Sequence, residues 1–162
     1  MSDQQSGHPH NELPPLLARD DGHRQCASCE RIVYSDPKLA VAAIVPHGDG
    51  IVLIKRGIEP EYGKWSFPSG YVDRGEVVER AVEREVLEET TLEVKADRLV
   101  GLYSRPGRAV VLAVYEARIT GGTLSAADEA LDANIFHPES LPSLAFEHDD
   151  QIVRDWIASS KP

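Results

Sequence analysis

Residues 70–92 read GYVDRGEVVERAVEREVLEETTL, and the interpretation of the whole chain starts from this stretch. Residues 76–89 contain no Gly or Pro, consist mainly of good helix formers and have acids in the first turn, a pattern that predicts an α-helix. At about 100° per residue, Val78, Ala81 and Val82 fall on one side of that helix. The sequence therefore predicts a helix that packs this apolar side on a core.

Three glutamates continue the apolar side of the helix. Glu85, Glu88 and Glu89 project on the same side as the apolar residues, whereas Glu83 projects elsewhere. Like charges at this spacing repel each other, and more strongly where solvent is excluded. A divalent cation compensates them directly, because Mg²⁺ prefers oxygen ligands and takes carboxylates together with phosphate oxygens. The alternative is a solvated acidic helix, which the inward phase of the three glutamates disfavours.

The segments around the helix predict an α/β protein. Residues 57–75 are rich in Gly, Pro and aromatic residues and lack periodicity, which is typical of a structured functional loop. Apolar and β-branched runs predict strands at 38–45, 51–56, 92–103, 109–119 and near 134–137, and helical spacing predicts a terminal helix at 149–159. The first two runs flank a turn and are expected to form a β-hairpin.

Length and charge exclude several classes of protein. The 162 residues suit one globular domain with a short appended segment. Lys and Arg number 17 against 27 Asp and Glu, a formal net charge of −10, which argues against a nucleic-acid partner and against binding to anionic membranes. No apolar run approaches the roughly 20 residues of a membrane span, and the polar residues 1–11 do not have the pattern of a secretory signal. We therefore expect a cytoplasmic protein.

The spacing of the central motif resembles a known family. From Gly70 the chain has five residues, Glu76, seven residues, Arg84-Glu85, an aliphatic residue, any residue and Glu88-Glu89. This order resembles the Nudix box, with Thr91 in the place of the glycine near its end. The resemblance implies a Nudix-type α/β/α sandwich with a mixed β-sheet. It also implies hydrolysis, dependent on Mg²⁺ or Mn²⁺, of a nucleoside diphosphate linked to another moiety.

The resemblance also assigns roles to residues of the motif. By position, Glu85, Glu88 and Glu89 are implied as metal ligands, one of which orients or deprotonates the attacking water. The Gly70 carbonyl is implied as a further ligand. Glu76 and Arg84 resemble the ion pair with which the family fixes the loop against the helix.

A further catalytic carboxylate is expected beyond the box. Glu129 and Asp132 are both candidates, in a segment predicted to be a loop. Acids in loops are often merely solvated, so the two stay open as alternatives.

Substrate-binding residues are expected on both sides of the motif. Arg105 and Arg108 flank a Pro-Gly turn, and a guanidinium there suits a distal phosphate. A flat adenine or flavin ring needs a flat partner, for which Tyr103, Phe67 and Tyr62 are candidates.

The N-terminal part is predicted to be a separate segment. Residues 1–36 are interpreted as a tail with a degenerate zinc-ribbon-like segment, and 37–162 as the Nudix domain. Cys26 and Cys29 have metal-ligand spacing, and the segment resembles that of ADP-ribose and FAD pyrophosphohydrolases with an N-terminal zinc ribbon. The first cysteine pair of such a ribbon is missing. Either the segment is metal-free, or upstream histidines complete a Zn²⁺ site; the candidates are His23, His10 and His8.

These expectations combine into one leading hypothesis. The small-molecule substrate is a nucleotide diphosphate such as ADP-ribose or FAD, with release of AMP. Two alternatives stay open: a housecleaning pyrophosphohydrolase of nucleoside triphosphates, and a Nudix-fold sensor that binds a nucleotide without cleaving it. Proteins that resemble this chain are frequently homodimers, so a homodimer is a further expectation.

Overall fold

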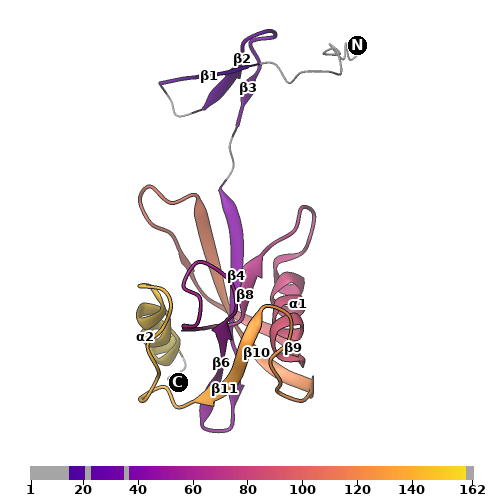
Figure 1. Ribbon diagram of the computed structural model, residues 1–162, viewed down its shortest axis with the longest axis vertical. Coiled ribbons are helices and arrows are strands. Elements are labelled where there is room, and N and C mark those ends of the chain that lie inside the picture. Colours follow the sequence, from indigo (N-terminus) through magenta and orange to yellow (C-terminus); the bar gives the residue numbers. More distant parts are fainter. Residues whose placement is uncertain (1–14, 21–22, 35–36, 160–162) are drawn as a thin grey trace. The chain divides into compact units, whose positions relative to one another are not determined.

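The computed structural model describes residues 15–20, 23–34 and 37–159. Its contacts divide the chain into two compact units, residues 1–37 and 38–162 (Figure 1). The division lies next to the boundary predicted from the sequence.

The first unit is a small antiparallel sheet. It consists of β1 (Leu16–Ala18), β2 (Arg24–Cys26) and β3 (Ile32–Val33), in the order β1-β2-β3. Cys26 is buried at the end of β2, and Cys29 is exposed in the following turn. Backbone N–H groups of Cys29 and Ser28 lower the pKa of the Cys26 thiol.

A zinc site in this unit stays a prediction. Within the described residues, no three His, Cys, Asp or Glu side chains form a group that could hold a metal ion. The candidate ligands His8 and His10 lie outside the described residues.

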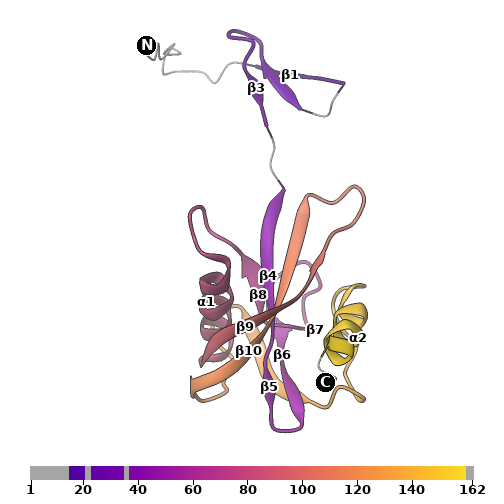
Figure 2. The same cartoon turned by 180° about the vertical axis from the view of Figure 1, so that it is seen from behind.

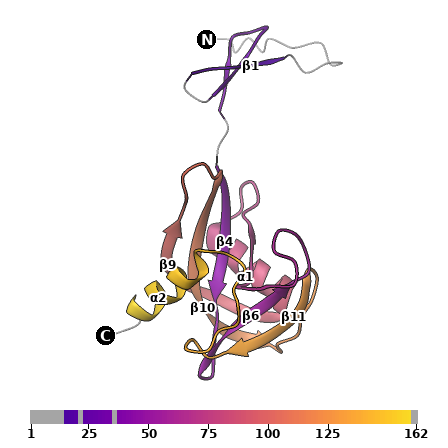
Figure 3. The ribbon, with the colours of Figure 1, turned by 60° about the vertical axis from the view of Figure 1, so that its left-hand side comes forward.

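In its described residues, 38–159, the second unit contains two four-stranded sheets and two helices. The first sheet has the order β8 (Ser69–Tyr71), β4 (Lys38–Ile44), β10 (Val110–Gly122), β9 (Leu92–Tyr103). It is mixed, because β4 and β10 are parallel and the other neighbours are antiparallel (Figure 3). The second sheet is antiparallel and consists of β11 (Ala130–Phe136), β6 (Gly50–Arg56) and β5 (Pro46–His47), with β7 (Trp65–Ser66) paired to β6.

The helices α1 (Val78–Thr90) and α2 (Asp149–Ser159) lie on opposite sides of the strands, as Figures 1 and 2 both show. The predicted mixed α/β fold with a mixed sheet is thereby confirmed. No helix in the described residues is long and apolar enough to cross a membrane.

The predicted hairpin between 38–45 and 51–56 is wrong for most of its length. Only the short β5 pairs with β6 beside the turn, whereas β4 pairs with β8 and β10 in the other sheet. The turn residues were sufficient to predict a reversal of the chain, but a local turn does not determine which sheet the preceding strand joins.

Alternation along β4 explains the two cores. Val41, Ala43 and Val45 face the cluster that includes the apolar side of α1. Ala42 and Ile44 face the cluster that includes Phe67 and residues of α2. Both faces of this central strand are therefore covered, as expected for a continuous apolar run.

Candidate active site

One open cleft of about 1410 Å³ runs along the second unit. Its walls come from α1, the segment 66–73, the 104–110 segment between β9 and β10, and the residues that precede α2. The cleft is lined by the three box glutamates, Glu129, the loop glycine Gly70 and the two arginines of the Pro-Gly turn, so the fold brings them together, whereas Glu76 and Asp132 are not in its lining.

Glu89 is the most deeply buried of the three box glutamates. Its residue is 6% exposed, and one carboxylate oxygen accepts a hydrogen bond of 2.8 Å from the Ser69 N–H. Burial raises the pKa of Glu89 to about 8, against the lowering effect of that N–H. A buried carboxylate with a raised pKa on a cleft wall is a typical feature of a functional site.

Glu85 lies directly against Gly70. A Cβ added at Gly70 would lie 2.2 Å from the carboxyl carbon of Glu85, so no other residue fits at position 70 without a shift. Burial also raises the pKa of Glu85 above its ordinary value, against the effect of the neighbouring Arg84. The loop backbone and the carboxylate are thus held in close contact.

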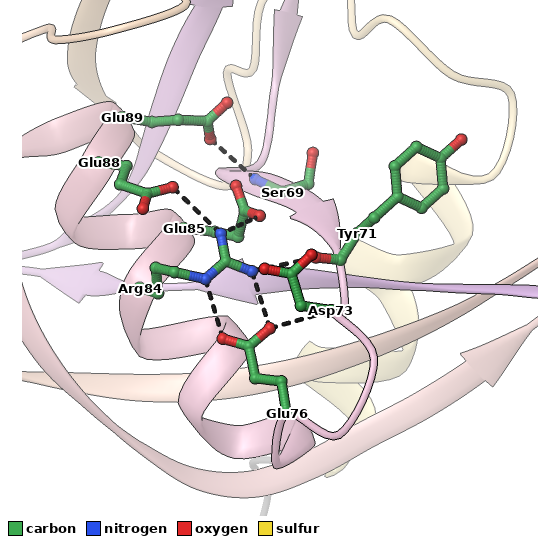
Figure 4. Close-up of polar contacts among 8 residues, drawn as sticks. All are labelled: Ser69, Tyr71, Asp73, Glu76, Arg84, Glu85, Glu88 and Glu89. Carbon is green, nitrogen blue, oxygen red and sulfur yellow. Dashed lines mark hydrogen bonds and ion pairs between the residues drawn. The ribbon is translucent and has the colours of Figure 1, made fainter.

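Arg84 connects the loop to the helix (Figure 4). Its Nε and Nη2 each donate to one oxygen of Glu76 at 2.9 Å, and Nη2 also donates to the Tyr71 carbonyl at 3.0 Å. Its Nη1 contacts Glu85 at 2.7 Å and Glu88 at 3.1 Å. The bidentate pair with Glu76 has the fork geometry that fixes a guanidinium in one orientation.

This arrangement perturbs the titration of both partners of the pair. The hydrogen bonds from Arg84, followed by that from the Asp73 N–H, lower the pKa of Glu76 to about 2. Glu76 in turn raises the pKa of Arg84 above its usual value. The pair therefore stays ionised over the physiological range.

The inward phase predicted for the three glutamates holds to different degrees. Glu89 is buried and Glu85 is partly buried, whereas the Glu88 side chain is 45% exposed. Glu88 lies at the rim of the helix face, where its charge is shared between Arg84 and solvent. The three glutamates therefore share one face of the helix, but their exposure to solvent increases from Glu89 through Glu85 to Glu88.

Of the two loop acids, Glu129 lines the cleft. Its charge contributes to the raised pKa of Glu89, after burial and the charge of Glu85. Its carbonyl accepts the Gly57 N–H at 2.7 Å, which ties the loop to the end of β6. The loop predicted around Asp132 is wrong, because Asp132 lies in β11 opposite Lys55; its side chain is exposed, and among the described residues the cleft lining does not include it.

The substrate-binding candidates differ in their surroundings. Arg105, paired with Glu147, and the exposed Arg108 line the cleft. Tyr103 also lines it, and its hydroxyl donates to Asp155 at 2.9 Å. Burial and the Asp155 carboxylate raise the pKa of Tyr103 to about 12. All three side chains line the cleft, and their role in substrate binding stays a prediction.

Two aromatic candidates have no open ring face in the cleft. Phe67 borders the cleft but is 2% exposed and belongs to the apolar core. Its role is to pack the cleft wall, because a buried ring cannot stack on a ligand. Tyr62 is 58% exposed and is not part of the cleft lining in the described residues.

Sequence reasoning missed Arg56. This residue ends β6, lines the cleft and is 8% exposed. Its Nε donates to the Pro60 carbonyl at 2.8 Å, and its guanidinium lies 5.1 Å from the centre of the Phe146 ring. The available signal was a charged residue that closes a run of buried strand residues, since buried arginine is rare unless it is paired.

Asp149 was also missed. It is 2% exposed at the start of α2, and its carboxylate accepts the Phe146 N–H at 2.9 Å. Burial raises the pKa of Asp149 to about 6, against the effects of that N–H and of Arg56. A helix-start aspartate was visible in the sequence, but its burial beside the cleft was not.

The fold and the site define the class. A mixed α/β fold in which a helix presents glutamates beside a glycine-containing loop is that of a Nudix-type hydrolase. Residues 36–157 match the NUDIX domain family, and the chain belongs to this family of hydrolases. The family and the enzyme class predicted from the box are therefore confirmed.

Individual relatives agree with this assignment. An ADP-ribose pyrophosphatase of Methanocaldococcus jannaschii is 40% identical over 129 residues, which cover 77% of this chain and 76% of the relative. An NAD-capped RNA hydrolase of Chromobacterium violaceum is 29% identical over 138 residues, which cover 83% of this chain and 51% of that protein. A crystal structure of a NUDIX hydrolase from Nitrosomonas europaea superposes with a TM-score of 0.80 at 25% identity, covering 90% of this chain and 86% of the other.

Proposed function

We propose that this protein hydrolyses the diphosphate bond of a nucleoside diphosphate linked to another moiety, with ADP-ribose as the first substrate to test and FAD as the second. AMP is one product, and the reaction uses Mg²⁺ or Mn²⁺. The similarity to an ADP-ribose pyrophosphatase at 40% identity supports the choice of substrate.

One structural observation carries the proposal. Buried Glu89 and partly buried Glu85 lie on the wall of an open cleft, fixed by Ser69 and Arg84. Burial removes both carboxylates partly from water and destabilises their charged form, which raises their pKa values. A bound dication removes that penalty, so the site favours a metal–diphosphate complex.

The donor types suit a hard divalent cation, although no three acidic side chains among the described residues are grouped closely enough to hold a metal ion, so binding would have to draw the carboxylates together. Glu85, Glu88 and Glu89 offer carboxylate oxygens, and Gly70 brings backbone against Glu85 where any side chain would clash. These four residues would hold the metal. When bound, the metal polarises phosphoryl oxygens and lowers the pKa of water.

The remaining roles belong to side chains of the chain itself. Arg84 and Glu76 keep the loop against the helix, so the carboxylates keep their spacing. Arg56, fixed by the Pro60 carbonyl and Phe146, presents positive charge in a mainly acidic cleft and suits a phosphate of the substrate. Arg105 suits the distal phosphate, and Glu129 is the candidate to orient the attacking water.

The test is a product analysis. The purified protein is incubated with Mg²⁺ or Mn²⁺ and ADP-ribose, FAD, NADH, ADP-glucose or nucleoside triphosphates, and products are separated by chromatography. We expect AMP from ADP-ribose or FAD and a loss of about 10²-fold or more in kcat for Glu89→Gln.

A matched control comes from the same helix. Glu79 accepts a hydrogen bond from the Tyr115 hydroxyl and lies outside the cleft lining, so Glu79→Gln is expected to keep full activity. Release of pyrophosphate from triphosphates, with no cleavage of ADP-ribose or FAD, would overturn the proposed substrate. Metal-dependent nucleotide binding without any turnover would point to a sensor.

A further inference from the structure

One end of the mixed sheet carries a row of side chains that the described residues leave partly exposed. Tyr71 pairs with Ala40, Ala40 with Leu112, and Leu112 with Tyr103. Residues directly opposite each other on neighbouring strands point to the same face of a sheet. The four residues therefore form one row across all four strands, and all four line the cleft.

The next row along the same face is fully packed on its two central strands. It includes Ala42 and Val114, which are 3% and 0% exposed and lie in the cluster with Phe67 and Ile152. In the first row Ala40 and Leu112 are only partly buried, and Tyr71 is 52% exposed. The covering by α2 and Phe67 thus ends between the two rows, which leaves an apolar strip of sheet open to the cleft.

The shape of this strip suits a flat group. Tyr71 and Tyr103 stand at its two ends, roughly 14 Å apart by three strand spacings, with the methyl group of Ala40 between them. Lys38 lies 4.9 Å from the centre of the Tyr71 ring, and Asp155 holds the Tyr103 hydroxyl. Because both rings have a second contact, the strip is preorganised as a shallow trough with aromatic ends.

The trough and the carboxylate site line the same cleft and meet at β8, with the trough on the face of the sheet that packs with α2, and α1 on the other face. Ser69, whose N–H binds Glu89, is two residues before Tyr71 on β8, a distance of about 7 Å. Figure 4 shows the Tyr71 ring pointing away from Glu85 and Arg84. A ligand with its diphosphate at the glutamates therefore needs a ribose-sized spacer to bring a ring onto the strip.

Arg105 and Arg108 follow Tyr103 closely in the chain and line the same cleft. The strip itself offers methyl groups, rings and the Tyr71 hydroxyl, so stacking dominates over recognition of polar base edges.

We propose that the strip formed by Tyr71, Ala40, Leu112 and Tyr103 binds the nucleobase of the substrate by stacking and apolar contact, with little discrimination between bases. This inference rests on the proposed function, whose diphosphate site it extends.

The test uses binding of two ligands to the full chain. Isothermal titration calorimetry compares AMP with ribose 5-phosphate, which lacks the base. We expect the wild-type protein to bind AMP at least about tenfold more tightly, the size typical of stacking one base on one aromatic side chain. Tyr71→Ala and Ala40→Leu are each expected to remove most of that preference and to leave the affinity for ribose 5-phosphate unchanged.

Tyr62→Ala is the matched control, because Tyr62 is an equally exposed tyrosine outside the cleft lining. Equal affinity of the wild-type protein for the two ligands, or equal weakening of both by Tyr71→Ala, would overturn the inference. Thermal melting of Ala40→Leu shows whether the added side chain is accommodated, and Tyr71→Ala tests the same trough without added bulk.

Binding separates this inference from the proposed function. Hydrolysis of ADP-ribose without an AMP preference would refute the strip alone. A Tyr71-dependent preference for AMP without hydrolysis of any diphosphate would refute the proposed reaction alone.

Discussion

Two walls of the cleft hold their charged side chains in opposite ways. On the helix wall, formed by α1 and residues 69–76, Arg84 is bound by Glu76, Glu85, Glu88 and the Tyr71 carbonyl. On the loop wall, formed by residues 104–109 and 145–149, the partly exposed Arg105 pairs with Glu147, whose side chain is 84% exposed.

The difference separates rigidity from recognition. Exchanging one of the Arg84 contacts for a ligand would break a multidentate network that is partly shielded from water, whereas Arg105 can exchange a solvated partner at little cost. The helix wall is therefore suited to keep catalytic geometry, and the loop wall to contact variable parts of the substrate.

The largest effect on the difference between the two walls is expected from Arg84→Met, which removes the central cation of the helix wall. We expect a loss of about 10²-fold in kcat and a destabilisation of about 1–3 kcal/mol, because three carboxylates lose their common partner. The stability figure is below that for fully buried pairs because the Arg84 side chain is 30% exposed.

The control for that variant is Arg80→Met. Arg80 pairs with Glu83 on the same helix, but its side chain is 67% exposed, so activity and melting temperature should stay close to wild type. Similar losses in both variants would show that the helix wall is merely sensitive to any lost charge.

Asp149 is the exception on the loop wall, because its charge is buried. Its folded-state pKa of about 6 lies above the ordinary 3.8, so the folded protein holds this proton more tightly than the unfolded chain. The stability associated with this proton is therefore full below about pH 4 and is lost as pH rises through 6.

Asp149→Asn keeps an acceptor for the Phe146 N–H and removes the charge. At pH 7 to 8 we expect the variant to be about 1–3 kcal/mol more stable than wild type, with the difference vanishing below about pH 4. Urea denaturation at several pH values measures this difference. A stabilisation that does not depend on pH would rule out titration of Asp149 as its cause.

Arg105→Met tests the loop wall, where the exposed ion pair of Arg105 with Glu147 can be exchanged for a contact with a ligand. We expect KM for ADP-ribose to rise by about three- to tenfold, with kcat and the melting temperature unchanged, because a rim ion pair contributes little to folding. Glu147→Gln keeps the Arg105 charge and removes its partner, so it should leave KM unchanged or lower it. A fall in kcat comparable to that of Arg84→Met would contradict the division of roles.

The smallest expected effect concerns the end of the helix wall. Thr91 has φ of 56°, in the left-handed region that favours glycine, and its hydroxyl donates to the Thr123 carbonyl at 2.5 Å. Thr91→Gly relieves strain of about 1–2 kcal/mol but loses this bond and gains chain entropy in the unfolded state, so we expect almost no change in the free energy of unfolding.

Thr91→Val separates the contribution of the hydrogen bond from that of the backbone strain. It keeps the strain and loses the hydrogen bond, and we expect a destabilisation of about 1 kcal/mol by urea denaturation. Equal stability of the Val variant and wild type would show that the bond to Thr123 contributes nothing.

Strong periodicity and the spaced motif made much of this molecule predictable from its sequence. The box positions predicted the contacts of Arg84 with Glu76, and helical spacing predicted α2 with its observed ends. The positions of side chains outside any motif could not be predicted in this way. Arg56 reaches the cleft because β6 ends there, and the open strip exists because strands distant in sequence align, which no local pattern encodes.

The parallel pairing of β4 with β10 also bears on the order in which the chain can fold. Lys38 pairs with Val110, and 110 − 38 is 72 residues, whereas β10 and β9 are joined by a short connection. During synthesis, β4 is completed well before β10, and until β10 is made the apolar faces of β4 lack their principal neighbour. A nascent chain released before β10 is complete would therefore expose the apolar run of β4, which makes premature termination in this region a direct route to aggregation.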